Sequence, residues 1–220
     1  MKSLVLDSGS IINLAMNDLL WTLEELGKKV KIEFIIPYSV RKEIIDKPMK
    51  SKKYKLEAIQ IKKLFSEKIL VEEKRINVNR YMDICNNLYY VNNNPLRIIQ
   101  EAELEALVLA KELNAGYVVD ERTIRMLVEG PEKLKKILEN KLKSEVTINS
   151  KHLKILKEEL CCVQVIRSTE LMYVAYEKGV FNSLIKGITK KEFLDGLLWG
   201  LRLRGCSIST EEIKKLISIS

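Results

Sequence analysis

The sequence predicts an α/β fold, a three-layer sandwich with a central, mainly parallel sheet and further helices towards the C-terminus. Three short apolar runs, at 4–6, 34–36 and 117–119, are typical of strands buried on both faces of a sheet. Longer segments with a helical spacing of apolar residues lie between them. Because strands that alternate with helices build βαβ units, the strands are expected to run parallel. With 220 residues, 46% of them hydrophobic, the chain can form a packed core.

The first predicted strand, 4–6, is followed at once by Asp7. In open α/β sheets the carboxyl ends of the strands face the ligand crevice, so a carboxylate at this point can meet a metal ion or a substrate. Taken alone, Asp7 is better explained as a cap on the next helix, whose apolar face starts at Ile11 and ends near Gly27. Other carboxylates at the same sheet edge would decide between these alternatives.

The second predicted strand, 34–36, is closed by Pro37, which opens a helix that carries Glu43. A single Glu in a charged segment is ordinarily solvated. From 41 to 63 the chain has nine basic residues against three acidic ones, its strongest positive cluster. This segment is therefore a candidate surface for a polyanion.

A mostly apolar helix is predicted at 98–113, and its acidic residues fall on two faces. Glu101, Glu105 and Glu112 share one stripe, which is expected to face solvent. Glu103 lies on the opposite face, among apolar side chains. Because a buried carboxylate is costly without a partner, Glu103 is expected either to pair with a Lys or Arg or to hold a metal ion.

The third apolar run ends in Asp120 and Glu121, which repeats the arrangement at Asp7. Together with Glu43 and Glu103, these acids make chance helix capping a poor explanation. Sets of carboxylates hold hard divalent cations such as Mg²⁺ or Mn²⁺, with water molecules completing the coordination.

The remaining segments complete a predicted core of 1–166. A further short strand is possible at 69–71, and another is expected at 163–166. Between them, about 131–160 forms a lysine-rich helical insertion, expected as two helices broken around 147–150.

The segment 167–220 is predicted to form helices that pack on the same domain. Ser168 is the expected N-cap of a helix at 169–178. Capping boxes predict the last two helices, Thr189 with Glu192 and Ser209 with Glu212.

The composition narrows the class of protein. The net charge of +8 and a pI near 9.2 favour a polyanionic partner, although proteins of hot environments are also rich in Lys, Glu and Ile. Four cysteines without a Cys-x-x-Cys pair, and one histidine, argue against a zinc site or a Cys/His nucleophile. No leader or membrane-spanning run is evident, so a cytoplasmic location with reduced thiols and no membrane partner is expected.

Four segments, in order along the chain, resemble the motifs of the PIN domain family of nucleases. They are 4–10, similar to the opening strand with the first catalytic Asp; 36–43, similar to Pro-x-x-Val-x-x-Glu; 102–110, similar to Gly-Glu-x-Glu-Ala; and 118–125, similar to the Asp-Asp-x-x-Ala-Arg segment of one branch. The segments 167–179 and 193–213 also look like the closing helices of that branch. The resemblance therefore covers most of the chain.

Some residues depart from the family pattern. Ala102 replaces Gly, Glu121 replaces the second Asp and Ile124 replaces Ala, while 131–160 has no counterpart. Because Glu121 is longer than Asp, the fourth metal ligand stays open between it and Asp120.

The resemblance implies a metal-dependent endoribonuclease that acts on single-stranded RNA. Cations held by carboxylates activate water and neutralise the scissile phosphate without a histidine or cysteine. The implied catalytic residues are Asp7, Glu43, Glu103 and Asp120. The implied ligands of Mg²⁺ or Mn²⁺ are Asp7, Glu103, Asp120 and Glu121. The candidate nucleic-acid contacts are Ser8, Ser10, Lys50, Lys52, Lys53 and Lys55.

Other functions are weighed against this one. A PIN-like scaffold with weak catalysis could bind RNA or a protein. A phosphatase with an aspartate nucleophile would carry Asp-x-Asp after its first strand, and here Gly9 occupies the second position. A toxin-type nuclease with an antitoxin-like partner, an RNA-processing enzyme and a homodimer all fit the sequence.

Overall fold

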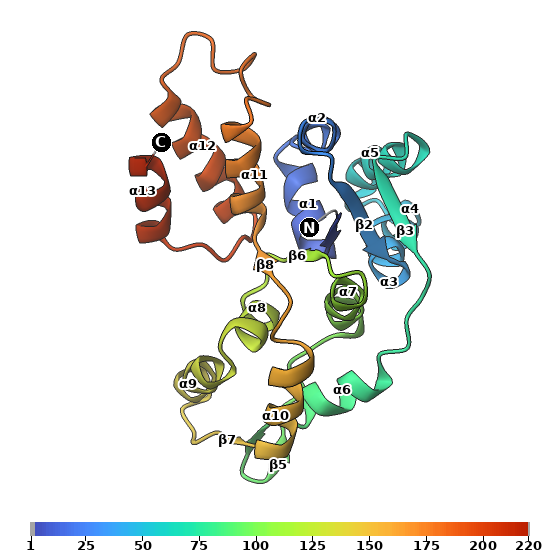
Figure 1. Ribbon diagram of the computed structural model, residues 1–220, viewed down its shortest axis with the longest axis vertical. Coiled ribbons are helices and arrows are strands. Elements are labelled where there is room, and N and C mark those ends of the chain that lie inside the picture. Colours follow the sequence, from blue (N-terminus) through green and yellow to red (C-terminus); the bar gives the residue numbers. More distant parts are fainter. Residues whose placement is uncertain (1–2, 220) are drawn as a thin grey trace.

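A computed structural model of the protein describes residues 3–219, and its centre is a parallel sheet of five strands (Figure 1). The strand order is β3 (Leu70–Glu73), β2 (Glu33–Pro37), β1 (Ser3–Leu6), β6 (Gly116–Val118) and β8 (Val165–Ile166). All four neighbouring pairs run parallel, with Val5 opposite Ile35 on one side and opposite Tyr117 on the other. The predicted α/β class and the parallel sheet are confirmed.

Helices cover both faces of this sheet and form the outer layers. From β1 the chain adds β2 and then β3 on one side of β1. It then crosses back and adds β6 on the other side of β1. Right-handed crossovers therefore put α1 (Ser8–Met16), α2 (Trp21–Val30) and α5 (Lys55–Ser66) on one face, and α7 (Glu101–Glu112) on the opposite face. Figure 1 shows this arrangement, with α7 under the strands and α1, α2 and α5 above them.

The sequence predicts one apolar helical face from Ile11 to about Gly27, but the structure divides it. α1 ends at Met16, and Asp18 takes a left-handed conformation with φ of 54° before α2 begins. Gly27 lies inside α2, which ends at Val30 and is followed by Lys31 in a second left-handed conformation. Apolar spacing continued through the break because both helices face the same core.

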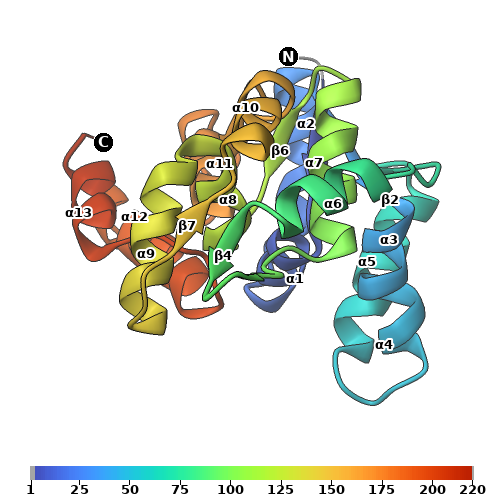
Figure 2. The same ribbon diagram turned by 90° about the horizontal axis from the view of Figure 1, so that it is seen from below.

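The segment between β2 and β3 is wound irregularly. α3 (Tyr38–Arg41) continues into a π-helical turn, η1 (Lys42–Asp46), and then into α4 (Lys47–Met49). Such π-turns occur often at functional sites, and this one carries Glu43. The basic turn that follows, up to α5, projects from the body of the protein (Figure 2).

A second, small antiparallel sheet lies away from the first. Its order is β5 (Asn94–Pro95), β4 (Tyr89–Val91) and β7 (Thr147–Ile148), and α6 (Asn79–Asn86) precedes it. The insertion at 131–160 contains α9 (Pro131–Leu142) and α10 (Ser150–Glu159), with β7 between them. The break predicted at 147–150 is therefore a strand that pairs with β4, next to Asn149, which caps α10.

Three helices close the chain after β8. They are α11 (Ser168–Glu177), α12 (Lys190–Leu203) and α13 (Thr210–Ile219), and α8 (Arg122–Glu129) lies between β6 and α9. α11 contacts α1 and α2, α12 packs on α11, and α13 packs on α12. Aromatic rings fasten this junction, since Trp21 meets Phe181 edge-on at 5.7 Å and Phe181 meets Phe193 at 5.0 Å.

Local capping follows the sequence with one exception. The two predicted capping boxes are present, since Glu192 and Glu212 each exchange hydrogen bonds with their partners Thr189 and Ser209. α11, however, starts at Ser168 and not at 169, with Arg167 as its N-cap. The Ser168 hydroxyl is not available as a cap because it donates to Asp120.

Two further features concern membrane-spanning helices and the cysteines. Across residues 3–219, no helix combines the length and apolar character needed to cross a membrane. Cys85, Cys161, Cys162 and Cys206 are all free thiols.

Candidate active site

Asp7 and Asp120 lie at the carboxyl ends of two adjacent strands. β1 is bonded to β2 on one side and to β6 on the other, so the order of connection reverses between β1 and β6. Such a switch point opens a crevice outside the strand ends, where open α/β sheets bind ligands. The backbone N–H of Asp7 donates to the carbonyl of Val118 at 3.1 Å, which fixes the two strand ends side by side.

Asp7 is the N-cap of α1 at this edge of the sheet. Its Oδ1 accepts the backbone N–H of Ser10 at 2.7 Å, and only 3% of the residue is exposed. Burial raises the pKa of Asp7 to about 7; hydrogen bonds from Ser10 oppose the rise, and the charges of Asp120 and Glu103 add to it. At Gly9, a Cβ would lie 3.3 Å from Oδ2, so the glycine keeps this oxygen uncrowded.

Asp120 is buried, and Asn13 of α1 and Ser168 of α11 donate hydrogen bonds to its carboxylate. Its Oδ1 accepts the backbone N–H of Ser168 at 2.8 Å, and its Oδ2 accepts the Ser168 hydroxyl at 2.7 Å. The same Oδ2 accepts the side-chain amide of Asn13 at 2.7 Å. These three bonds fix the carboxylate at the end of β6, between α1 and α11.

Glu103 lies in the first turn of α7 and is partly buried. Its Oε2 accepts the backbone N–H of Gln100 at 2.9 Å. Burial raises the pKa of Glu103, the hydrogen bond from Gln100 opposes this, and the negative charges of Glu121 and Glu43 raise the pKa further. The charge of Glu103 thus acts on Asp7, and the charges of Glu121 and Glu43 act on Glu103.

The outer acids, Glu121 and Glu43, use local partners. Glu121 is exposed and caps α8, accepting the backbone N–H of Ile124 at 3.0 Å and that of Thr123. Glu43 is partly buried and lies 3.9 Å from the Lys47 ammonium. Both contribute negative charge to the crevice without a shared hydrogen bond to the inner acids.

A hard divalent cation matches the chemistry of this site. All of its charged donors are carboxylate oxygens, which Mg²⁺ and Mn²⁺ prefer. Asp7 and Glu103 each give one oxygen to a backbone N–H and keep a second. Within 3–219, however, no three Asp, Glu, His or Cys side chains are arranged to enclose one metal ion. The residues fit such an ion by donor type, and the side chains would have to turn towards it.

Glu105 differs from its prediction, because it is buried and not solvated. Only 1% of the residue is exposed, and its carboxylate accepts the backbone N–H groups of Ser39 at 3.2 Å and Ile76 at 2.9 Å. The prediction from helical periodicity failed because other parts of the protein cover α7 on nearly every side. Every residue from Ala102 to Ala110 except Glu103 is buried. Glu105 therefore joins α7 to α3 and to the loop after β3.

The predicted nucleic-acid contacts divide into two groups. Ser10 is fully buried, and its hydroxyl donates to the carbonyls of Asp7 and Val118, so the prediction that it contacts nucleic acid is wrong. Ser8 is partly exposed in the first turn of α1. The predicted lysines are all exposed: Lys50, Lys52 and Lys53 lie in the turn between α4 and α5, and Lys55 is the first residue of α5.

Sequence reasoning missed Asn13 and underused Ser168. Asn13 is 1% exposed, and besides Asp120 its amide donates to the carbonyl of Leu201 at 3.0 Å. An amide within the apolar run 11–15 was the signal available for Asn13. Ser168 was interpreted only as a helix cap, although it lies two residues after a strand end, as Asp120 does.

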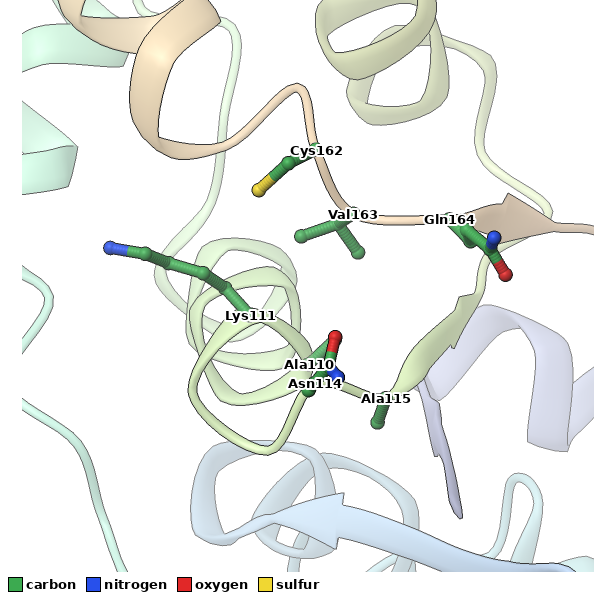
Figure 3. A pocket seen from close by; sticks show the side chains of 7 residues that line it. All are labelled: Ala110, Lys111, Asn114, Ala115, Cys162, Val163 and Gln164. Atoms are coloured by element: carbon green, nitrogen blue, oxygen red, sulfur yellow. The ribbon is translucent and has the colours of Figure 1, made fainter. Parts of the chain in front are cut away.

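A separate hollow lies at the opposite edge of the sheet. Figure 3 shows it between the C-terminal end of α7, with Lys111 and Asn114, and the segment that carries Cys162 and Gln164 into β8. This is where β6 and β8 begin, whereas ligand crevices of parallel sheets lie where strands end. The hollow is therefore not part of the candidate active site.

Comparison with known proteins gives one match. The model of a protein family described as a PIN domain matches residues 3–130, more than half of the chain. The matched part includes Asp7, Glu43, Glu103, Asp120 and Glu121, and it ends just before α9. No similar curated protein and no similar solved structure was found.

Proposed function

Because the chain belongs to the PIN domain family, whose members are generally nucleases, we propose that it is a metal-dependent endoribonuclease acting on single-stranded RNA. One observation supports this above all: Asp7 and Asp120 follow adjacent strands at the switch point of the sheet, with Glu103 close enough to raise the pKa of Asp7. A crevice with buried, mutually repelling carboxylates is suited to a divalent cation and a phosphodiester.

Asp7, Glu103 and Asp120 would hold Mg²⁺ or Mn²⁺, and Glu121 is the candidate for a further ligand. Bound there, the cation would activate a water molecule and neutralise charge on the scissile phosphate. Asn13 and Ser168 orient Asp120 through their hydrogen bonds, and the Ser10 N–H orients Asp7. Partners of this kind commonly affect metal affinity or activity by about 10–100-fold.

Binding of the RNA backbone is assigned to the basic segment beside Glu43. The lysines of the turn between α4 and α5 are exposed and continue along the chain from η1. Contacts of ammonium groups with phosphates do not depend on sequence and weaken with salt. This arrangement suits a nuclease that holds single-stranded RNA across its crevice.

A PIN-like scaffold with weak catalysis, binding RNA or a protein, is the second candidate. Two observations favour this scaffold. Both oxygens of Asp120 already accept hydrogen bonds from the protein. Within 3–219, no three side chains of the kind that bind metals are arranged around one point. The carboxylates at Asp7, Glu43 and Glu103 favour the nuclease.

Cleavage of labelled single-stranded RNA and DNA, with Mn²⁺ and with EDTA, separates the two candidates. We expect RNA cleavage that requires Mn²⁺ and is abolished by Asp7→Asn or Glu103→Gln. Glu112→Gln, on the exposed side of α7, is the matched control and should retain full activity. Cleavage that persists in EDTA, or in both variants, would contradict the nuclease proposal, and RNA binding without cleavage would favour the scaffold.

A further inference from the structure

A hollow of about 260 Å³ adjoins the candidate active site at Glu43. Its walls come from α3, η1, the start of α4, the loop after β3 and the N-terminal end of α7. Its lining includes Tyr38, Ser39, the basic Lys42, Lys47 and Arg75, and the acidic Glu43 and Glu101. The volume is slightly below the ~300–1,000 Å³ usual for ligand sites, which suits a single nucleotide more than a longer segment.

The walls of the hollow are fixed by the buried carboxylate of Glu105. One of its oxygens accepts the N–H of Ser39 and the other accepts the N–H of Ile76, so α3 and the loop after β3 are fastened to the same residue of α7. Tyr38 and Arg75 directly precede the two bonded residues. The backbone that carries these side chains is therefore held in place, as a preformed site requires.

The lining has the chemistry of a nucleotide site. The Tyr38 side chain is 37% exposed, which leaves the ring accessible for a base to stack on. Arg75, Lys42 and Lys47 supply positive charge, and Arg75 is held by Glu101 at 2.6 Å. The Ser39 hydroxyl is buried beneath this lining and has no hydrogen-bond partner within 3–219.

We propose that this hollow receives the nucleotide next to the scissile phosphate, with its base on Tyr38 and its phosphate at Arg75 and Lys47. The proposal rests on the proposed nuclease function, because it takes the crevice at Asp7 and Glu103 as the point of cleavage. Glu43 lines the hollow, and its charge raises the pKa of Glu103, so the hollow lies beside the candidate catalytic acids.

The test measures binding and cleavage separately. A short fluorescein-labelled single-stranded RNA of mixed sequence is titrated in EDTA and followed by fluorescence anisotropy, for the parent and for Tyr38→Ala, Tyr38→Phe and Arg75→Ala. Arg80→Ala is the matched control, because Arg80 is 62% exposed and paired with Glu159, while Arg75 is 65% exposed and paired with Glu101. Cleavage in Mn²⁺ is measured on the same proteins.

We expect Tyr38→Ala and Arg75→Ala each to weaken RNA binding about 10-fold, equivalent to ~1.4 kcal/mol. Tyr38→Phe keeps the ring and should bind like the parent, as should Arg80→Ala. Parent-like binding by Tyr38→Ala and Arg75→Ala, an equal loss in Arg80→Ala, or no RNA binding by the parent would overturn the proposal. Arg75 is exposed, so its variant remains informative even if Tyr38→Ala fails to fold.

The two readouts keep this proposal apart from the nuclease proposal. If the parent cleaves no RNA but the binding pattern holds, the nuclease function fails and the nucleotide site stands. If the parent cleaves RNA and both variants bind and cleave as it does, the nucleotide site fails and the nuclease stands.

Discussion

The side-chain amide of Asn13 donates a hydrogen bond of 2.7 Å to Oδ2 of Asp120, across 107 positions of sequence. Both residues are buried, and the bond joins the helix after β1 to the end of β6. The position of Asp120 in the candidate site therefore depends on α1 as well as on its own strand.

Asn13→Ala is expected to lower both activity and stability. It removes one of the three donors to the buried Asp120 carboxylate, which should cost about 1–3 kcal/mol of unfolding free energy. The rate of RNA cleavage should fall about 10-fold or more. Urea unfolding and single-turnover cleavage measure these effects, with the exposed Asn94→Ala as control. An Asn13→Ala protein with parent-like activity would show that Asp120 needs no orientation by α1.

Glu105→Gln is expected to destabilise the fold. The carboxylate accepts two backbone N–H groups, whereas glutamine has one acceptor oxygen and an amide that would face the second N–H. An unsatisfied buried donor costs about 1–3 kcal/mol. Urea unfolding compares it with Glu112→Gln on the exposed side of α7. Equal stability of the two variants would mean that Glu105 does not fasten α3 and the loop after β3.

Asp7→Asn is expected to stabilise the metal-free protein above neutral pH. Since the folded pKa is about 7 and the ordinary value 3.8, the folded state holds the proton more tightly than the unfolded chain. The penalty for the ionised carboxylate is absent below pH 3.8, grows towards pH 7 and is complete above it. It amounts to a few kcal/mol, at ~1.4 kcal/mol per pKa unit. Asn removes the charge and is an equally good N-cap.

Urea unfolding in EDTA across this pH range measures the difference, which should shrink as the pH falls. In a second measurement, Mn²⁺ should raise the melting temperature of the parent more than that of Asp7→Asn, because the cation binds the assembled acids and not the unfolded chain. A parent that does not respond to Mn²⁺, or a variant that responds as fully, would remove the shared metal site.

Charge reversal of Lys50, Lys52, Lys53 and Lys55 should weaken RNA binding and make it less sensitive to salt. All four are exposed, so the fold should not change. Anisotropy titrations at several salt concentrations measure the slope. Lys154→Glu, on α10 and 77% exposed, is the control. A slope unchanged by the four reversals would move the search for RNA contacts to the lysines of α9.

Glu212→Gln is expected to lose stability at neutral pH but not in strong acid. Burial opposes ionisation, but hydrogen bonds from Arg167 and Ser209 lower the pKa of Glu212 to about 2. The stabilisation is therefore complete above the ordinary value of 4.5 and is lost as the pH falls through about 2. Glu212 is 45% exposed, so solvent keeps the effect within ~1 kcal/mol. Thermal unfolding against pH, with Glu211→Gln as control, should show the gap closing in acid.

The sequence by itself determined the parallel sheet and the edge at which Asp7 and Asp120 lie. Both conclusions follow from local information: short apolar runs form buried strands, and the residue after a strand lies at its carboxyl end. The capping boxes at Thr189 and Ser209 were predictable for the same reason, since their donors and acceptors lie within one helical turn.

Only the tertiary structure decided which acids are buried and what holds them. Periodicity gives the angle between Glu103 and Glu105 on α7, but not which angles the rest of the protein covers, and α7 is covered on nearly every side. The bonds of Asn13 and Ser168 to Asp120 join residues 107 and 48 positions apart, which no local pattern records. The strand order that makes β1 and β6 neighbours likewise depends on long-range packing, because it fixes which strand ends, and so which carboxylates, share the crevice.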